Sequence, residues 1–135
     1  MEIAALVLWI ITAIGGFILL AKWIAGGGAK PGGGSRLPAP VVFAHFLLAA
    51  AGLVLWIIYV VIDADALAWV SFALLVVIAL AGFAMVARWL PVYQGTASGA
   101  DAAPEKGFPV AVVGLHGVLA VATVVTVLLS ALDIG

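Results

Sequence analysis

Four long runs without a charged side chain constrain this chain more than any other feature. Each run is close to or above the roughly 20 apolar residues that an α-helix needs to cross about 30 Å of hydrocarbon. Only 8 % of the 135 residues are charged, whereas soluble domains have about a quarter. The sequence therefore predicts an integral membrane protein with four spanning segments. The runs are Ile3–Ala21, Val41–Ile62, Ala66–Ala87 and Gly107–Leu132.

The predicted fold class is all-α, because the period-two alternation of a transmembrane β-barrel strand is absent from the apolar runs. The spans then use nearly the whole chain, so residues 1–135 form a single transmembrane domain. Short connections favour an up-down four-helix bundle. The predicted spans are residues 3–24, 41–62, 66–90 and 108–132, and the longer loops are residues 25–40 and 91–107.

The basic residues are distributed unevenly along the chain. All five lie in or beside the two longer loops, whereas the residues near both termini and in the turn between the second and third spans are acidic or uncharged. Short loops rich in Lys and Arg stay on the cytoplasmic side. The sequence therefore predicts a multi-pass protein of the cell membrane with both termini outside. There is no basic surface that would favour nucleic acid as a partner.

The ends of the first and third spans resemble each other at an offset of 66 residues. A basic residue followed by tryptophan recurs at this offset, and composition alone does not explain that match. Each unit contains two spans, so both units have the same orientation, which predicts parallel repeats about a pseudo-two-fold axis along the membrane normal. The matched pairs are Gly16 and Gly82, Phe17 and Phe83, Ala21 and Ala87, Lys22 and Arg88, and Trp23 and Trp89.

The only two histidines, His45 and His116, lie inside the second and fourth spans. These spans run in the same direction, so in an up-down bundle they are diagonal neighbours, and both histidines are expected near the loops. An ionisable residue inside a span is costly and is a functional candidate. Each histidine could instead hydrogen-bond a neighbouring carbonyl and only pack helices together. Two such residues at one depth favour a shared ligand, for which the natural candidate is haem iron with two axial imidazoles.

Small residues surround the predicted site. Ala49 and Gly52 share a helix face with His45 and leave room for a flat macrocycle. Gly16 and Gly82 in the flanking spans would let the backbone approach it closely, although ordinary small-residue packing explains these glycines equally well. Lys22 and Arg88 stand at equivalent places in the two repeats. They are expected either to pair with haem propionates or to extend to lipid headgroups.

With these residues the chain resembles the four-helix membrane cytochromes b, in which diagonal helices each supply a histidine and the other two helices carry glycines. The resemblance implies haem b as cofactor, His45 and His116 as axial ligands of its iron, and electron transfer with a redox partner protein or a quinone. Many such cytochromes hold two haems and need two further histidines, which this chain lacks. The resemblance therefore implies one haem, near the cytoplasmic face.

The function predicted from the sequence is that of a small membrane haem b protein, as an electron carrier or a subunit of a redox complex. The alternative is a non-catalytic membrane protein, either an accessory subunit or an oligomeric transporter or channel, with the histidines in packing or in a proton relay. Two histidines without cysteine are too few for a zinc or copper site. A carrier or accessory role is favoured over an enzymatic one, and small residues on the helix faces are compatible with a homodimer.

Two further expectations concern the ends of the spans. Tryptophans near both ends predict aromatic belts at the two membrane interfaces. The first loop is rich in glycine and proline, which predicts a flexible linker. The belt residues would be Trp23 and Trp89 at the loop side, and Trp9, Trp56, Trp69 and Tyr59 at the other.

Overall fold

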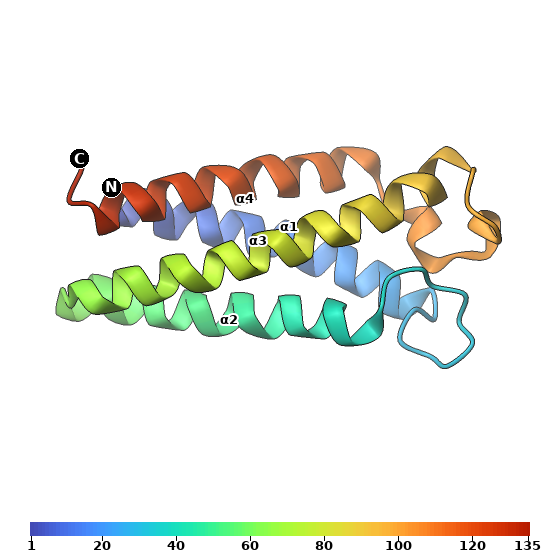
Figure 1. Cartoon of the computed structure of the whole chain (residues 1–135), viewed down its shortest axis with the longest axis horizontal. Coiled ribbons are helices and arrows are strands. Elements are labelled where there is room, and N and C mark those ends of the chain that lie inside the picture. The colour runs from blue at the N-terminus through green and yellow to red at the C-terminus, as the bar shows by residue number, and fades with distance from the viewer.

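The computed structural model describes all 135 residues as an all-helical chain (Figure 1). Four helices are each long and apolar enough to cross a membrane, which confirms the predicted number of long apolar helices. Two short 3-10 helices occupy the second long loop. The elements are α1 (Glu2–Ala25), α2 (Ala39–Ile62), α3 (Asp65–Gln94), η1 (Ala100–Ala102), η2 (Pro104–Gly107) and α4 (Val110–Ala131).

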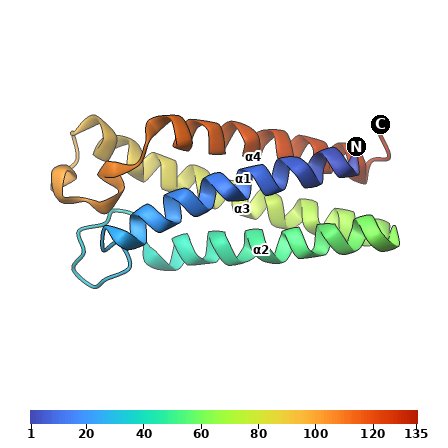
Figure 2. The same ribbon diagram turned by 180° about the vertical axis from the view of Figure 1, so that it is seen from behind.

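The four long helices lie side by side as a bundle (Figures 1 and 2). Helix α1 contacts α2 and α4, and α3 also contacts α2 and α4, so α1 faces α3 across one diagonal and α2 faces α4 across the other. Both termini and the α2–α3 turn lie at one end, called here the terminal end. The Met1 amino group donates to the Gly135 carbonyl there, at 3.2 Å. The two longer loops form the opposite end, called here the loop end.

The turn between α2 and α3 is very short because a residue in the left-handed backbone conformation reverses the direction of the chain. Asp63 ends α2 with φ of 54° and donates its backbone N–H to the Tyr59 carbonyl at 2.8 Å. Aspartate is one of the few residues that tolerate this conformation. Helix α3 therefore begins at Asp65 and runs antiparallel to α2.

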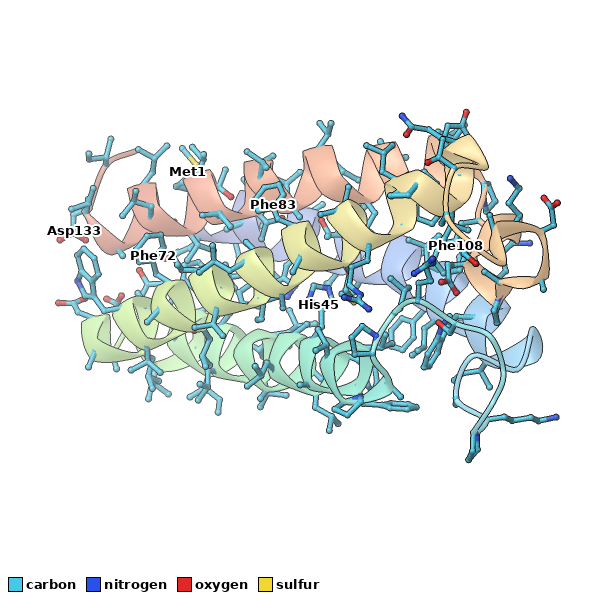
Figure 3. All side chains as sticks on the ribbon, turned by 45° about the vertical axis from the view of Figure 1, so that its right-hand side comes forward. Met1, His45, Phe72, Phe83, Phe108 and Asp133 are labelled. Carbon is cyan, nitrogen blue, oxygen red and sulfur yellow. The ribbon has the colours of Figure 1, made fainter.

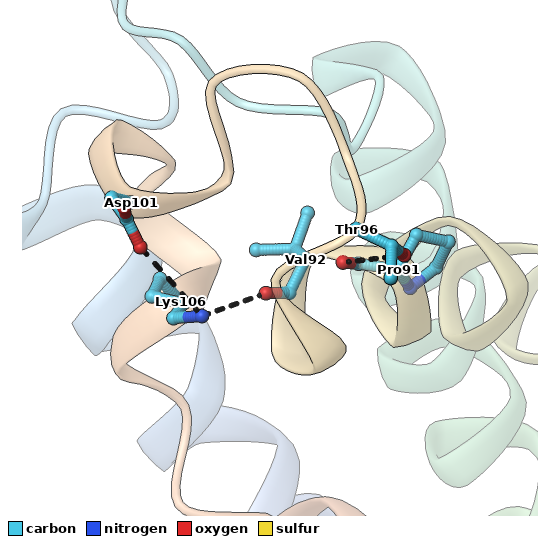
Figure 4. Close-up of polar contacts among 5 residues, drawn as sticks. All are labelled: Pro91, Val92, Thr96, Asp101 and Lys106. Atoms are coloured by element: carbon cyan, nitrogen blue, oxygen red, sulfur yellow. Dashed lines mark hydrogen bonds and ion pairs between the residues drawn. The ribbon is translucent and has the colours of Figure 1, made fainter.

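Helix α3 is longer than its predicted span, because it continues through Pro91 to Gln94. A proline removes its own hydrogen bond from a helix, and such a turn persists only if other contacts support it. Here the Lys106 side chain donates to the Val92 carbonyl at 3.1 Å, and the Thr96 hydroxyl donates to the Pro91 carbonyl at 3.4 Å (Figure 4). Hydrogen bonds from the second loop thus stabilise the last turn of α3.

The surface of the bundle is apolar on every helix, and only 22 of 135 residues are buried. Large apolar side chains point outward in numbers that a water-soluble protein does not show. This surface and the four long helices describe a multi-pass membrane protein. Exposed examples, one from each helix in order, are Phe17, Leu47, Leu80 and Val118.

The interior contains two separate clusters of buried apolar side chains on the bundle axis. The terminal cluster is built around Trp9 and Trp56, and the loop-end cluster around Trp23 and Trp89. The aromatic-belt prediction is therefore wrong for Tyr59, which is also buried, and for these four tryptophans, whereas Trp69 is 44 % exposed. Their indoles fill space between the helices, and three of the buried N–H groups have acceptors: the Glu2 carbonyl for Trp56, the Ser35 hydroxyl for Trp23 and the Glu105 carbonyl for Trp89.

The first loop is fastened to the second loop by a buried carboxylate. Glu105 is fully buried and accepts from the Ser35 hydroxyl at 2.9 Å and from the Arg36 backbone N–H at 2.6 Å. Gly28 lies against the Trp23 indole so closely that an added Cβ would stand 2.3 Å from it. The segment predicted to be a flexible linker thus makes specific contacts that close the loop end.

Candidate functional site

His45 from α2 and His116 from α4 face each other across the diagonal of the bundle. Their ring centroids are 6.3 Å apart, and the ring planes are inclined at 67°. Figure 3 shows His45 between the helix ribbons, in the interior of the bundle. Both side chains are partly buried. The structure therefore brings together the two residues that the sequence selected as a shared site.

Each imidazole is oriented by a hydrogen bond to a backbone carbonyl of a neighbouring helix. His45 Nδ1 is 3.0 Å from the Ile78 carbonyl on α3, and His116 Nδ1 is 2.8 Å from the Thr12 carbonyl on α1. Because a carbonyl only accepts, each Nδ1 must carry the proton and donate it. In the neutral ring this leaves the lone pair on Nε2. It is the tautomer that metal-binding histidines adopt when Nδ1–H is held by a carbonyl.

Two glycines make these hydrogen bonds sterically possible. Gly16 lies one turn after Thr12, and Gly82 lies one turn after Ile78. A Cβ added to Gly16 would stand 3.0 Å from His116 Cε1, and one added to Gly82 would stand 3.3 Å from Cε1 of the other histidine. Even an alanine would therefore crowd the imidazole. The predicted glycines do line the histidine site, and the structure places them against the imidazole rings.

The layer that contains the two histidines separates the two apolar clusters. On its terminal side Leu48 and Ala49 pack against the terminal cluster, and on its loop side Leu20 and Met85 pack against the loop-end cluster. A mainly apolar groove of about 500 Å³ runs between α3 and α4, and Gly117, the neighbour of His116, is part of its lining. Neither histidine lines this groove, and the two imidazoles form a polar layer between the two apolar clusters.

The remaining predicted site residues are not gathered around the histidines. The atoms that a Cβ on Gly52 would meet belong to Trp9 and Ile78, so Gly52 accommodates an indole of the terminal cluster. Lys22 is exposed at the loop end and makes no hydrogen bond or ion pair. Arg88 Nε donates to the Arg36 carbonyl at 2.6 Å. The pairing of Lys22 and Arg88 with propionates stays a prediction.

The hydroxyl that adjoins the His116 acceptor was not among the residues predicted from the sequence. Thr12 Oγ1 and Thr123 Oγ1 are 3.3 Å apart, and each is also bonded to the carbonyl one turn earlier in its own helix. Thr12 also supplies the carbonyl that His116 reaches. One available signal was that Thr12 stands four residues before Gly16, as Ile78 stands before Gly82. The predicted repeat therefore pairs the two acceptor residues as well as the two glycines.

Comparison with known proteins gives no relative: no family model matches the chain, and no curated protein or solved structure matches it.

Proposed function

We propose that this chain is a small membrane haem b protein in which His45 and His116 are the two axial ligands of one haem iron. The observation that carries the proposal is the pair of imidazoles that face each other from diagonal helices, each with Nδ1–H bound to a carbonyl and Nε2 left to coordinate. Bis-imidazole ligation is one of the standard ways in which proteins hold haem.

The spacing of the two rings supports a metal ion between them. A coordinating imidazole nitrogen lies about 2 Å from its metal, so the ring centre lies about 3 Å away and two opposite rings lie about 6 Å apart. The observed distance between centroids is 6.3 Å. The same distance is also within the range for direct edge-to-face packing of two rings, so the spacing is compatible with a metal ion but does not require one. The donor set and the spacing both fit the group.

The proposal includes a tandem repeat with a pseudo-two-fold axis. The carbonyls that accept from the histidines belong to Thr12 and Ile78, which are 66 residues apart, as are Gly16 and Gly82. The two halves would thus supply one ligand each and one supporting carbonyl each. The charge distribution supports an orientation with the loop end in the cytoplasm and both termini outside.

The protein residues in this proposal bind and orient the group. The Nδ1–H bonds fix the ring orientation and make Nε2 a better donor, and the loop-end cluster restricts water. Haem iron would supply one-electron transfer. The chain has no second pair of histidines toward the terminal end, so an electron would enter and leave on the loop side, from a redox partner protein or a quinone. The role is that of a carrier or a subunit of a redox complex.

The alternative, in which the histidines only pack helices or relay protons, has one observation in its favour. Both Nδ1 atoms already have acceptors, so each ring satisfies the requirement of a packing histidine with a single bond. This function needs no ligand at Nε2. The two proposals therefore differ in a measurable property, the ability of the purified protein to hold haem.

Absorption spectroscopy of protein purified from haem-supplied cells tests the proposal. We expect a Soret band and a low-spin spectrum, conversion to a high-spin species in His45→Ala or His116→Ala, and loss of the band in the double variant. Thr126→Val is the matched control, because the Thr126 hydroxyl donates only to carbonyls of its own helix. A wild-type protein without a Soret band, or a double variant with an unchanged one, would leave the packing alternative.

A further inference from the structure

Two arginines line a surface pocket at the loop end that is separate from the histidine site. The pocket has a volume of about 300 Å³ and is lined by Arg36, Arg88, Pro91 and Ala97. Arg36 lies in the first loop just before α2, and Arg88 lies in the last turns of α3. Residues far apart in the sequence thus place two guanidinium groups at one concave site.

Backbone contacts hold both guanidinium groups in place. Arg36 Nη2 donates to the Ser98 carbonyl at 3.1 Å, and Arg88 Nε donates to the Arg36 carbonyl at 2.6 Å. Each group keeps donors that no protein atom accepts. Arg36 Nε is buried without a hydrogen-bond acceptor. An unpaired buried donor on a charged group is costly, so a ligand that accepts hydrogen bonds would be stabilised here.

The positive charge of the pocket is not neutralised within the chain. The nearby carboxylate of Glu105 is bound to Ser35 and to the backbone N–H of Arg36, and it makes no ion pair with the Arg36 side chain. The other carboxylate of the second loop, Asp101, lies 3.9 Å from Lys106 in the one ion pair of the protein (Figure 4). Two fixed and unpaired guanidinium groups in one pocket therefore favour an anion.

We propose that this pocket binds the phosphate group of a phospholipid in the leaflet that borders the loop end. Phosphate oxygens match the forked donors of arginine, and basic pockets at the ends of spanning helices are suited to lipid headgroups. The neighbouring side chains Leu90 and Tyr93 on α3 are exposed. They would lie beside acyl chains and the interface while the headgroup occupies the pocket. In this proposal the anion that Arg88 binds is a lipid phosphate and not the haem propionate predicted from the sequence.

Native mass spectrometry of the full chain in detergent, prepared without haem, tests this site and does not depend on the haem proposal. The probes are dioleoyl phosphatidic acid, dioleoylglycerol with the same chains but no phosphate, and inorganic phosphate. We expect retained phosphatidic acid and little retained dioleoylglycerol. Inorganic phosphate at the same concentration should compete weakly. Because each guanidinium group would donate charge-assisted hydrogen bonds to the phosphate, Arg36→Gln and Arg88→Gln should each weaken phosphatidic acid binding by about tenfold or more.

Lys22→Gln is the matched control, because Lys22 carries the same charge at the same end of the bundle without lining the pocket. It should change binding by less than about twofold. Arg88→Lys keeps the charge but loses the forked geometry, and it should fall between Arg88→Gln and wild type. Arg36→Gln retains the backbone N–H that Glu105 binds, so it remains informative if Arg88→Gln misfolds.

Three results would overturn the phospholipid site. The first is equal weakening by Lys22→Gln and Arg88→Gln, which would indicate general attraction to a basic surface. The second is inorganic phosphate that binds as well as phosphatidic acid, which would make the ligand a soluble phosphate. The third is an Arg88→Gln variant that keeps phosphatidic acid but loses affinity for added haem, which would return Arg88 to the propionates.

Discussion

The terminal cluster and the histidine layer share one packing feature, but the aromatic ring involved has a different role in each. In both, a glycine on one helix makes room for an aromatic ring from a neighbouring helix. A Cβ on Gly52 would stand 2.9 Å from the Trp9 indole, and a Cβ on Gly16 would stand 3.0 Å from the His116 imidazole. Trp9 is only 3 % exposed and packs among apolar side chains, whereas the imidazole is partly buried and bonded to a carbonyl.

The difference shows what a ring must do in each place. An indole is large enough to fill the space between four helices, so the side chains of the terminal cluster need no bound ligand to fill it. An imidazole is smaller, and its orientation is set by one hydrogen bond. The two facing imidazoles therefore leave the histidine layer held by polar contacts. The comparison predicts that substitutions in the terminal half reduce stability, and that substitutions in the histidine layer reduce ligand binding.

The largest effect on stability is expected for Trp9→Ala. Removing a buried indole leaves a cavity that the other helices fill only in part, and such substitutions cost about 3–5 kcal/mol. Circular dichroism during unfolding in mixed detergent micelles would measure the loss. The haem spectrum should keep its shape, because Trp9 packs in the terminal cluster, with its indole beside Gly52.

Trp9→Phe provides a graded control, because it keeps an aromatic ring and should lose less than half as much stability. If Trp9→Ala instead left stability unchanged and abolished the Soret band, the terminal cluster would be part of the ligand site. The contrast between an apolar terminal cluster and a polar histidine layer would then be broken.

A somewhat smaller effect is expected for Glu105→Ala at the loop end. Its carboxylate accepts two hydrogen bonds in a fully buried position, and each buried donor left unpaired costs about 1–3 kcal/mol. Thermal unfolding in detergent should show the loss, and limited proteolysis should cleave within the first loop, near Ser35. Glu105→Gln keeps an acceptor and should lose less. A loop that stays resistant in Glu105→Ala would show that the carboxylate does not hold the two loops together.

The comparison is tested most directly by Gly82→Ala, for which we expect a cost of about 1–2 kcal/mol from overpacking but a large loss of haem. The added methyl group would stand 3.3 Å from His45 Cε1 and displace the ring from its carbonyl. Gly117→Ala is the matched control, because no atom lies within 4 Å of its added Cβ. Titration with haem should give weaker binding for Gly82→Ala only. Equal affinities in the two variants would contradict the role assigned to Gly82.

The spans and the position of the histidines were predictable because the bilayer imposes strong rules on length and polarity. Helix diagonals follow from the up-down order, so the facing of His45 and His116 was also within reach. The aromatic residues were not, because hydropathy does not say whether an indole such as Trp23 points to lipid or to the bundle interior. The burial of Glu105 could likewise not be predicted from the sequence, since a lone loop carboxylate usually faces water and only the fold reveals its partners.

The smallest effect is expected for Thr12→Val. Thr12 lies at the boundary between the terminal cluster and the histidine layer, so this variant tests where one region ends and the other begins. The substitution removes the hydroxyl that lies 3.3 Å from the Thr123 hydroxyl but keeps the carbonyl that His116 binds. Polar contacts between spanning helices average about 0.6 kcal/mol, partly because the unfolded state in the membrane also finds partners. Unfolding in mixed micelles should show a loss of this size. The low-spin haem spectrum should persist, because the acceptor for Nδ1 is backbone. A spectrum converted to high spin in this variant would mean that the hydroxyl pair itself positions the imidazole, and the histidine layer would then extend one turn further toward the terminal end.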